Sequence, residues 1–218
     1  MVVVKPYAGC RGIFLDLDGT LADSLGVLRK VYFRFLEEFG IKGSDSEFRE
    51  MNGPKLAEIV SILRKRYDLT DDALDLLMVY NRLIDEAYQD AQPLSGAREL
   101  LENAWKRGWT LVLVTSNLQV RAQAWLTKHG FSSLFHFIVS GEEVKRGKPF
   151  PDLYQLALSR SGCVTEESFA VEDGLQGAQA ALGAGLRTFV IRSEFESEVL
   201  WPRETEFIGQ SKELSSVI

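Results

Sequence analysis

The chain has 218 residues, of which 45% are hydrophobic and 26% charged, and its formal net charge is −6. This composition is typical of a folded domain with a sizeable core, which excludes a largely disordered chain. The acidic balance disfavours nucleic-acid binding, and no apolar run approaches the ~20 residues of a membrane-spanning helix. The length predicts one domain with a large insertion, or two small domains.

Cysteine usage and the N-terminus both bear on the compartment. Cys10 and Cys163 lie far apart in the sequence, and neither has a CxxC partner. A disulfide framework is therefore not expected, and a reduced environment fits. The apolar run at residues 2–4 is too short for a signal peptide, and Lys5 follows it rather than preceding it. We expect a cytoplasmic protein.

Five short apolar runs predict the strands of a parallel sheet. Each is rich in β-branched or aromatic residues and lacks polar alternation, as in strands that are buried on both faces. The runs cover residues 12–16, 111–115, 137–139, 169–171 and 188–191. Apolar residues at helical spacing predict helices over residues 94–107, 118–129, 151–161 and 174–184. The alternation of strands and helices predicts an α/β fold with right-handed crossovers.

One stretch, residues 23–92, contains no convincing strand. Its amphipathic stripes predict helices over residues 25–39, 56–63 and 74–87, the last of them broken in two. We expect an all-helical cap domain at 23–92, inserted into an α/β core formed by residues 1–22 and 93–218. Near the C-terminus we expect a short edge strand at 207–208 and a last helical turn within 212–217.

Ligands of open α/β sheets bind beyond the carboxyl ends of the strands, so the residues that follow each strand matter most. Asp16 and Asp18 follow the first predicted strand, and their spacing of two points both side chains the same way. Two carboxylates this close repel each other unless a cation joins them. Oxygen ligands of this kind suit Mg²⁺, although a solvated Asp-Gly turn is an equally fair interpretation.

Three more polar segments stand near the ends of later strands. Thr115-Ser116-Asn117 combines a hydroxyl with free amides at a helix start, which suits an anion. Lys148 lies in a loop between Gly147 and two prolines, where it could neutralise a phosphate. Glu172-Asp173 precedes glycines that open a helix and could complete a metal site. Each segment alone also fits an ordinary helix cap or a surface charge.

Together, these segments resemble the haloacid dehalogenase superfamily, in particular its phosphatase-like members with a helical cap. The resemblance covers roughly residues 10–192 and rests on four segments in the family's order. They are Asp16-Leu17-Asp18-Gly19-Thr20-Leu21-Ala22-Asp23-Ser24, Val114-Thr115-Ser116-Asn117, Gly147-Lys148-Pro149-Phe150-Pro151-Asp152 and residues 171–181. The resemblance implies a Rossmann-like parallel sheet with the cap inserted after the first motif.

The resemblance also implies roles for the site residues. Asp16 is the expected nucleophile, which forms an aspartyl-phosphate, and Asp18 is the expected general acid and base. Mg²⁺ is expected on an Asp16 oxygen, the Asp18 backbone carbonyl and Asp173, with Glu172 direct or through water. The groups expected to hold the phosphoryl oxygens are Thr115, the Ser116 amide and Lys148, with Asn117 beside them. Asp18 favours phosphoryl transfer, because the dehalogenases lack an acid at this position.

Substrate choice is expected to reside in the cap. Residues 51–56 resemble the cap loop of phosphoglycolate-phosphatase-like members, and Arg49 and Lys55 are candidate contacts to a second anionic group. As solvated charges at helix ends they are at least as plausible. The β-phosphoglucomutase branch usually has a histidine in the first cap helix, and residues 25–39 contain none.

We therefore expect a Mg²⁺-dependent phosphatase for a small phosphorylated metabolite such as phosphoglycolate or a sugar phosphate. The alternatives are a phosphosugar mutase and a non-catalytic binding protein of the same fold. No nucleic-acid or membrane partner is expected, and the chain is expected to be a monomer or a homodimer.

Overall fold

The computed structural model describes residues 10–192, 200–208 and 213. Its centre is a six-stranded sheet in which every neighbouring pair of strands is parallel. The strand order is β5 (Phe137–Ser140), β4 (Thr110–Thr115), β1 (Gly12–Leu15), β6 (Phe169–Glu172), β7 (Arg187–Ile191) and β8 (Thr205–Ile208). The five predicted strands are confirmed, and the predicted edge strand at 207–208 is part of β8.

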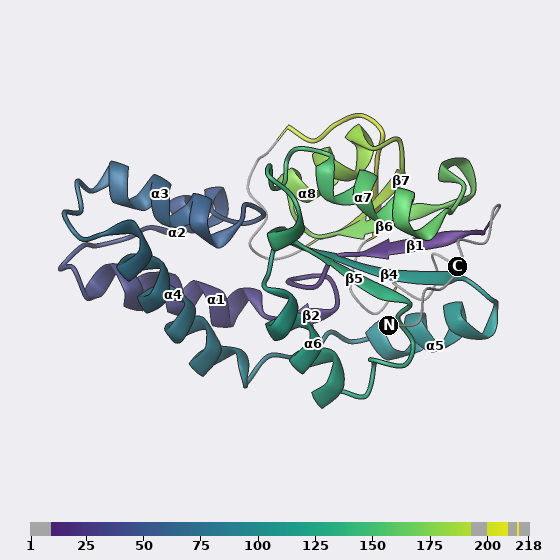
Figure 1. The fold of residues 1–218 in the computed structure, drawn as a ribbon, viewed down its shortest axis with the longest axis horizontal. Helices are drawn as coiled ribbons and strands as arrows, with labels where there is room; N and C mark the ends of the chain where they lie inside the picture. The colour runs from purple at the N-terminus through teal and green to yellow at the C-terminus, as the bar shows by residue number, and fades with distance from the viewer. Residues whose placement is uncertain (1–9, 193–199, 209–212, 214–218) are drawn as a thin grey trace.

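Helices cover both faces of the sheet, because successive strand residues point to opposite sides. Ile13 and Leu15 belong to the apolar cluster that contains residues of α5 and α6, whereas Phe14 packs in the cluster of α7 and α8. Figure 1 shows these two helix pairs on opposite sides of the strands. The bounds are α5 (Ala97–Lys106), α6 (Gln119–Lys128), α7 (Asp152–Ser161) and α8 (Leu175–Gly183). The predicted α/β fold with its parallel sheet is confirmed.

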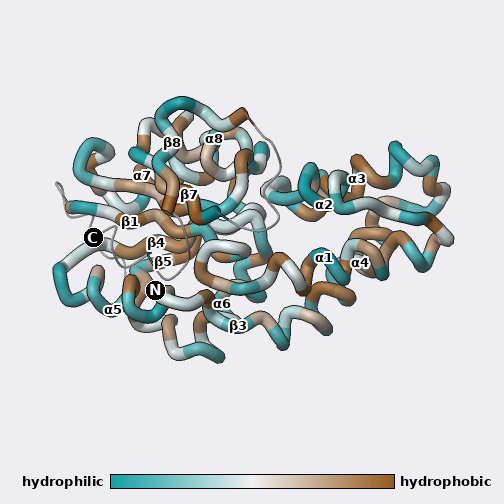
Figure 2. The backbone as a smooth tube through the Cα atoms, turned by 180° about the vertical axis from the view of Figure 1, so that it is seen from behind, coloured by the Kyte–Doolittle hydropathy of each residue, from teal (hydrophilic) through white to brown (hydrophobic). Residues whose placement is uncertain are grey.

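Residues 25–88, hereafter the helical insert, form four helices at the carboxyl end of the sheet (Figure 1). They are α1 (Leu25–Glu37), α2 (Asp45–Glu50), α3 (Leu56–Arg66) and α4 (Ala73–Tyr88). Along them hydrophilic and hydrophobic residues alternate, whereas the central strands are largely hydrophobic (Figure 2). None of the helices in the described residues could span a bilayer.

Two details of the insert differ from the sequence expectation. The predicted break in the third stripe is wrong: α4 is continuous, because Tyr80, Leu83 and Ile84 keep the buried face unbroken and no Gly or Pro interrupts it. The helix α2 was not predicted. It begins at the N-cap Ser44, whose hydroxyl accepts a hydrogen bond from the Glu47 amide at 3.2 Å.

The two connections to the insert lie side by side. β2 (Ala22–Asp23) pairs antiparallel with β3 (Gln92–Pro93). Two-residue strands carry no hydrophobic period, so the sequence does not reveal them. The chain therefore enters and leaves the helical insert at the same place, close to Asp18. The domain limits proposed above remain a prediction.

The cysteine expectation is wrong: Cys10 and Cys163 form a disulfide. Cys10 stands just before β1 and Cys163 a few residues before β6, and these neighbouring parallel strands bring their starting segments together. Sequence distance hides this proximity. A cytoplasmic location stays a prediction that the cysteines no longer support. The predicted C-terminal helical turn lies outside the described residues except for Glu213.

Candidate active site

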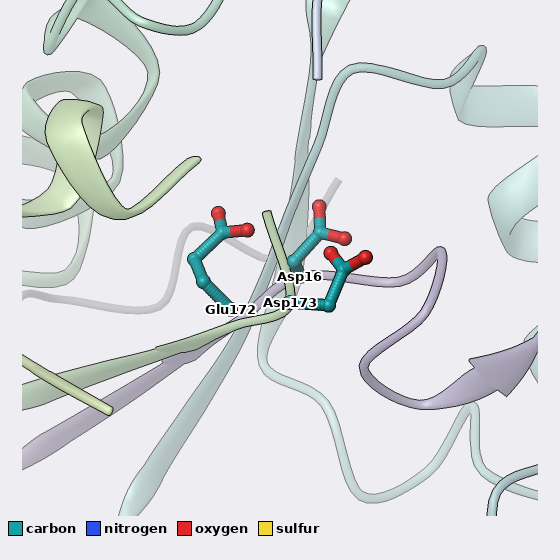
Figure 3. Close-up of side chains that lie close together, drawn as sticks. All are labelled: Asp16, Glu172 and Asp173. Carbon is teal, nitrogen blue, oxygen red and sulfur yellow. The ribbon is translucent and has the colours of Figure 1, made fainter. Parts of the chain in front are cut away.

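Three carboxylates meet at the carboxyl edge of the sheet. Asp16 follows β1, Glu172 ends β6 and Asp173 follows it. Because β1 and β6 are adjacent and parallel, their ends deliver these side chains to one point. One oxygen of each carboxylate lies within 4.8 Å of the others, and all three residues are buried (Figure 3). The sequence motifs after these two strands are thus brought together.

Lys148 neutralises part of this cluster. Its Nζ lies 2.6 Å from Asp16 Oδ1, 2.6 Å from Glu172 Oε1 and 3.2 Å from the Val114 carbonyl oxygen. Burial opposes the ammonium charge, but the two carboxylates outweigh burial and hold the pKa of Lys148 above its ordinary value. Lys148 is therefore a fully charged group in contact with the predicted nucleophile.

The remaining charge of the cluster calls for a second cation. Burial raises the pKa of Asp16 well above its ordinary value despite Lys148, and burial together with Glu172 raises the pKa of Asp173 to about 7. When ionised, three carboxylates against one ammonium leave two negative charges, which a divalent cation would balance. The donors are all oxygen atoms, as Mg²⁺ prefers. The residues present therefore fit this metal.

Two glycines leave room for the carboxylates. Gly19 has a positive φ of 78°, and a Cβ there would collide with the Asp173 carboxylate. A Cβ at Gly177, near the start of α8, would collide with the Glu172 carboxylate. Larger residues at these two positions would displace the carboxylates that form the cluster.

Asp18 stands apart from the carboxylate cluster. Its Oδ1 accepts hydrogen bonds from the Ser24 hydroxyl at 2.6 Å and the Tyr88 hydroxyl at 2.7 Å. Its Oδ2 accepts one from the Asn117 amide nitrogen at 3.0 Å. Burial, followed by the charge of Asp18, raises the pKa of Tyr88 well above its ordinary value, so the phenol remains a donor. Three hydrogen bonds therefore fix the Asp18 side chain beside the carboxylate cluster, of which it is not part.

The predicted anion-binding segment begins at Thr115, the last residue of β4, and continues into the loop before α6. Thr115 is buried, and its Oγ1 accepts a hydrogen bond from the backbone N–H of Asn117 at 3.1 Å. The Ser116 hydroxyl donates to the Gly53 carbonyl of the helical insert. All three residues of the segment line the same cavity as Asp16, Asp18 and Lys148.

The predicted cap loop contacts the carboxylate cluster through Asn52 and not through the expected pair, Arg49 and Lys55. Asn52 donates a hydrogen bond to Asp173 Oδ2 at 3.1 Å. Lys55 lines the cavity, but its Nζ donates to the carbonyl oxygens of Val144 and Lys145 at 3.2 and 2.9 Å. Arg49 lies on α2 and is not among the described residues that line the cavity. A substrate-binding role for Arg49 and Lys55 remains a prediction.

Three residues at the site were missed from the sequence. Tyr88 holds Asp18, and Tyr154 on α7 donates to the Glu172 carboxylate. Arg121 on α6 is buried and donates to Asn117 Oδ1 at 2.7 Å, Asp85 Oδ1 at 2.8 Å and Asn81 Oδ1 at 3.1 Å. The spacing of four residues between Asn117 and Arg121 was a usable signal. Their partners on α4 had none, because only folding brings them close.

The profile of the haloacid dehalogenase-like hydrolases matches residues 13–191. The chain belongs to this family. The matched range contains every predicted core-motif residue from Asp16 to Asp173. Among haloacid dehalogenase-like structures, CbbY from Rhodobacter sphaeroides aligns with a TM-score of 0.80 at 22% identity, over 94% of this chain and 96% of that one. This likeness shows the fold.

Several relatives of this haloacid dehalogenase-like hydrolase are named phosphatases. The phosphorylated carbohydrates phosphatase of Thermotoga maritima is 29% identical over 184 residues, 81% of this chain and 82% of the relative. The 6-phosphogluconate phosphatase of Escherichia coli is 26% identical over 208 residues, 93% and 92% of the two chains. The bifunctional riboflavin kinase/FMN phosphatase of Arabidopsis thaliana is 24% identical over 207 residues. The chain spans only 54% of that protein.

Proposed function

We propose that this chain hydrolyses the phosphate monoester of a small metabolite, with Mg²⁺ and through an aspartyl-phosphate on Asp16. The observation that carries the proposal is the contact of Lys148 with both Asp16 and Glu172 beside Asp173, at the carboxyl edge of the sheet. The family and the phosphatase names of the relatives support it.

In the first step a carboxylate oxygen of Asp16 attacks phosphorus, and the bond from phosphorus to the alcohol oxygen breaks. Asp18 supplies the proton that the departing alcohol takes up. Lys148, Thr115 and the Ser116 amide hold the phosphoryl oxygens as negative charge moves onto them. Bound Mg²⁺, held by Asp16, Asp173, Glu172 and the Asp18 carbonyl, would shield the phosphate charge from the anionic nucleophile.

In the second step water hydrolyses the aspartyl-phosphate. Asp18, now ionised, takes a proton from the water, which attacks phosphorus and releases Asp16. Hydrolysis is favoured over mutase chemistry because α1 contains no histidine, the residue that the mutase branch usually carries there. An intact set of charged groups argues against a non-catalytic binding protein, because a site that had lost its chemistry would be expected to lose some of these buried carboxylates.

Chelation tests the metal requirement. We expect treatment with EDTA followed by desalting to lower phosphate release from p-nitrophenyl phosphate by at least about 100-fold, since the bound cation supplies several kcal/mol of charge stabilisation. Added Mg²⁺ should restore the activity, whereas added Na⁺ at equal ionic strength should not. Full activity in the chelated, desalted protein would refute the metal assignment.

Arg121 should act on turnover through Asn117. We expect Arg121→Met to lower kcat by about tenfold for an alkyl phosphate, because Asn117 Oδ1 then loses one of the two donors that orient this side chain toward Asp18. For p-nitrophenyl phosphate, whose leaving group needs little proton transfer, the loss should be clearly smaller. The matched control is Arg98→Met, which removes a half-exposed arginine outside the cavity. Equal losses on both substrates would point to a structural role only.

A further inference from the structure

The cavity above the nucleophile is apolar on the side of the helical insert. It has a volume of about 320 Å³ and extends from Asp16 to helices α1, α3 and α4. Its apolar roof includes Leu28, Met51, Leu56, Ile59, Leu77 and Ile84. The phosphoryl group must lie on the floor beside Asp16 and Lys148. The alcohol part of the substrate therefore faces the apolar roof.

Every cation that lines this cavity in the described part of the chain already has partners. Lys148 is bound by Asp16 and Glu172, and Arg121 by Asp85 and Asn117. Lys55 donates to two backbone carbonyls of the core. The Nζ of Lys55 also lies 3.9 Å from Glu58 Oε1, so a second phosphate or a carboxylate on the substrate would have to compete with existing partners for every one of these cations. This arrangement disfavours an anionic alcohol part.

The cavity also offers few hydrogen-bonding groups to a sugar or polyol on the side of the insert. Besides Lys55, the polar side chains that line the cavity from the insert are Asn52, Asn81 and Tyr80. Asn52 donates to Asp173, and Asn81 accepts from Arg121, so each amide already uses one of its hydrogen-bonding groups within the protein. Hydroxyl groups placed against the apolar roof would leave hydrogen bonds unmade, at a cost for each of them. Hydrocarbon placed there would gain from leaving water.

From this we infer the class of substrate: a phosphate monoester whose alcohol part is uncharged and largely hydrocarbon. The inference rests on the proposed phosphatase function and sharpens it. A volume of about 320 Å³ lies at the lower end of ligand cavities, which suits one ring or a short chain rather than a long lipid. This class differs from the carbohydrate and phosphogluconate substrates in the names of two relatives.

A matched pair of esters tests the inference. Cyclohexylmethyl phosphate and glucose 6-phosphate share a six-membered ring and a primary ester, and differ in the ring oxygen and hydroxyls. We expect kcat/KM to be at least about tenfold higher for cyclohexylmethyl phosphate. A preference for glucose 6-phosphate would overturn the inference and leave the phosphatase function intact. Absence of Mg²⁺-dependent phosphate release from both esters, p-nitrophenyl phosphate and acetyl phosphate would overturn the function itself.

A pair of leucine variants tests the roof directly. Leu77 lines the cavity from α4, whereas Leu74, one turn earlier, is 70% exposed. Leu77→Asn should lower the ratio of the two kcat/KM values at least about fivefold, because it places an amide where the hydrocarbon ring lies. Leu74→Asn should leave the ratio unchanged. An unchanged ratio in Leu77→Asn would contradict the inference. If Leu77→Asn fails to fold, the ratio of the two kcat/KM values in the wild-type protein still decides the inference.

Discussion

Asp16→Asn should abolish phosphate release from every substrate, by at least about 10⁴-fold, because an amide cannot form the aspartyl-phosphate. The fold should survive the change. Removing one carboxylate from a buried cluster with excess negative charge relieves repulsion, and Lys148 keeps its contact with Glu172 at 2.6 Å. We expect a melting temperature in the absence of metal no lower than that of the wild type.

The measurement combines steady-state phosphate release with acid quenching of labelled substrate, which traps the covalent intermediate. Asp16→Asn should trap none. Asp152→Asn serves as the matched control. Asp152 is the first residue of α7, and it pairs with Arg146 outside the carboxylate cluster. That variant should behave like the wild type. Substantial turnover by Asp16→Asn, with the control intact, would mean that another group is the nucleophile.

Asp18→Asn should slow turnover by about 10²–10⁴-fold, because proton transfer to the alcohol and from the water is lost. An amide oxygen at this position can still accept from the hydroxyls of Ser24 and Tyr88, and only the hydrogen bond from Asn117 to Asp18 Oδ2 is lost. With p-nitrophenyl phosphate the first step needs no proton, and only the second step should be slow. We therefore expect a burst of p-nitrophenol of about one per enzyme molecule, followed by slow release.

Rapid-mixing absorbance measurements would record this burst. Asp23→Asn is a suitable control, because Asp23 is exposed and lies on β2, outside the cavity. It should show wild-type turnover. If Asp18→Asn turned over p-nitrophenyl phosphate and an alkyl phosphate at wild-type rates, Asp18 would not be the proton donor.

The sequence predicted the strands well because their information is local. Continuous apolar runs such as residues 111–115 specify a strand buried on both faces, whichever neighbours it acquires. The order of motifs near the strand ends also predicts that Asp16, Lys148, Glu172 and Asp173 lie at one edge of the sheet. Parallel topology makes this possible, because all carboxyl ends of such a sheet lie together.

Interactions between distant segments were not accessible in the same way. Tyr88 and Asp18 are 70 residues apart, and Arg121 and Asp85 are 36 apart. Nothing in the local pattern of α4 marks Tyr88 as a partner of Asp18, since a tyrosine near a helix end fits simple packing. The same reason explains the missed disulfide between Cys10 and Cys163, whose separation is 153 residues.

The sequence by itself determined the fold class and the four core motifs, because hydrophobic period and motif spacing are properties of short segments. The tertiary structure alone decided what surrounds them: which donors hold Asp18, where Lys55 is anchored and that an apolar roof faces Asp16. These features arise when the helical insert takes its place at the carboxyl end of the sheet, where some of its apolar residues line the cavity. Periodicity marks such residues as buried, but it cannot distinguish burial in a core from burial against a substrate.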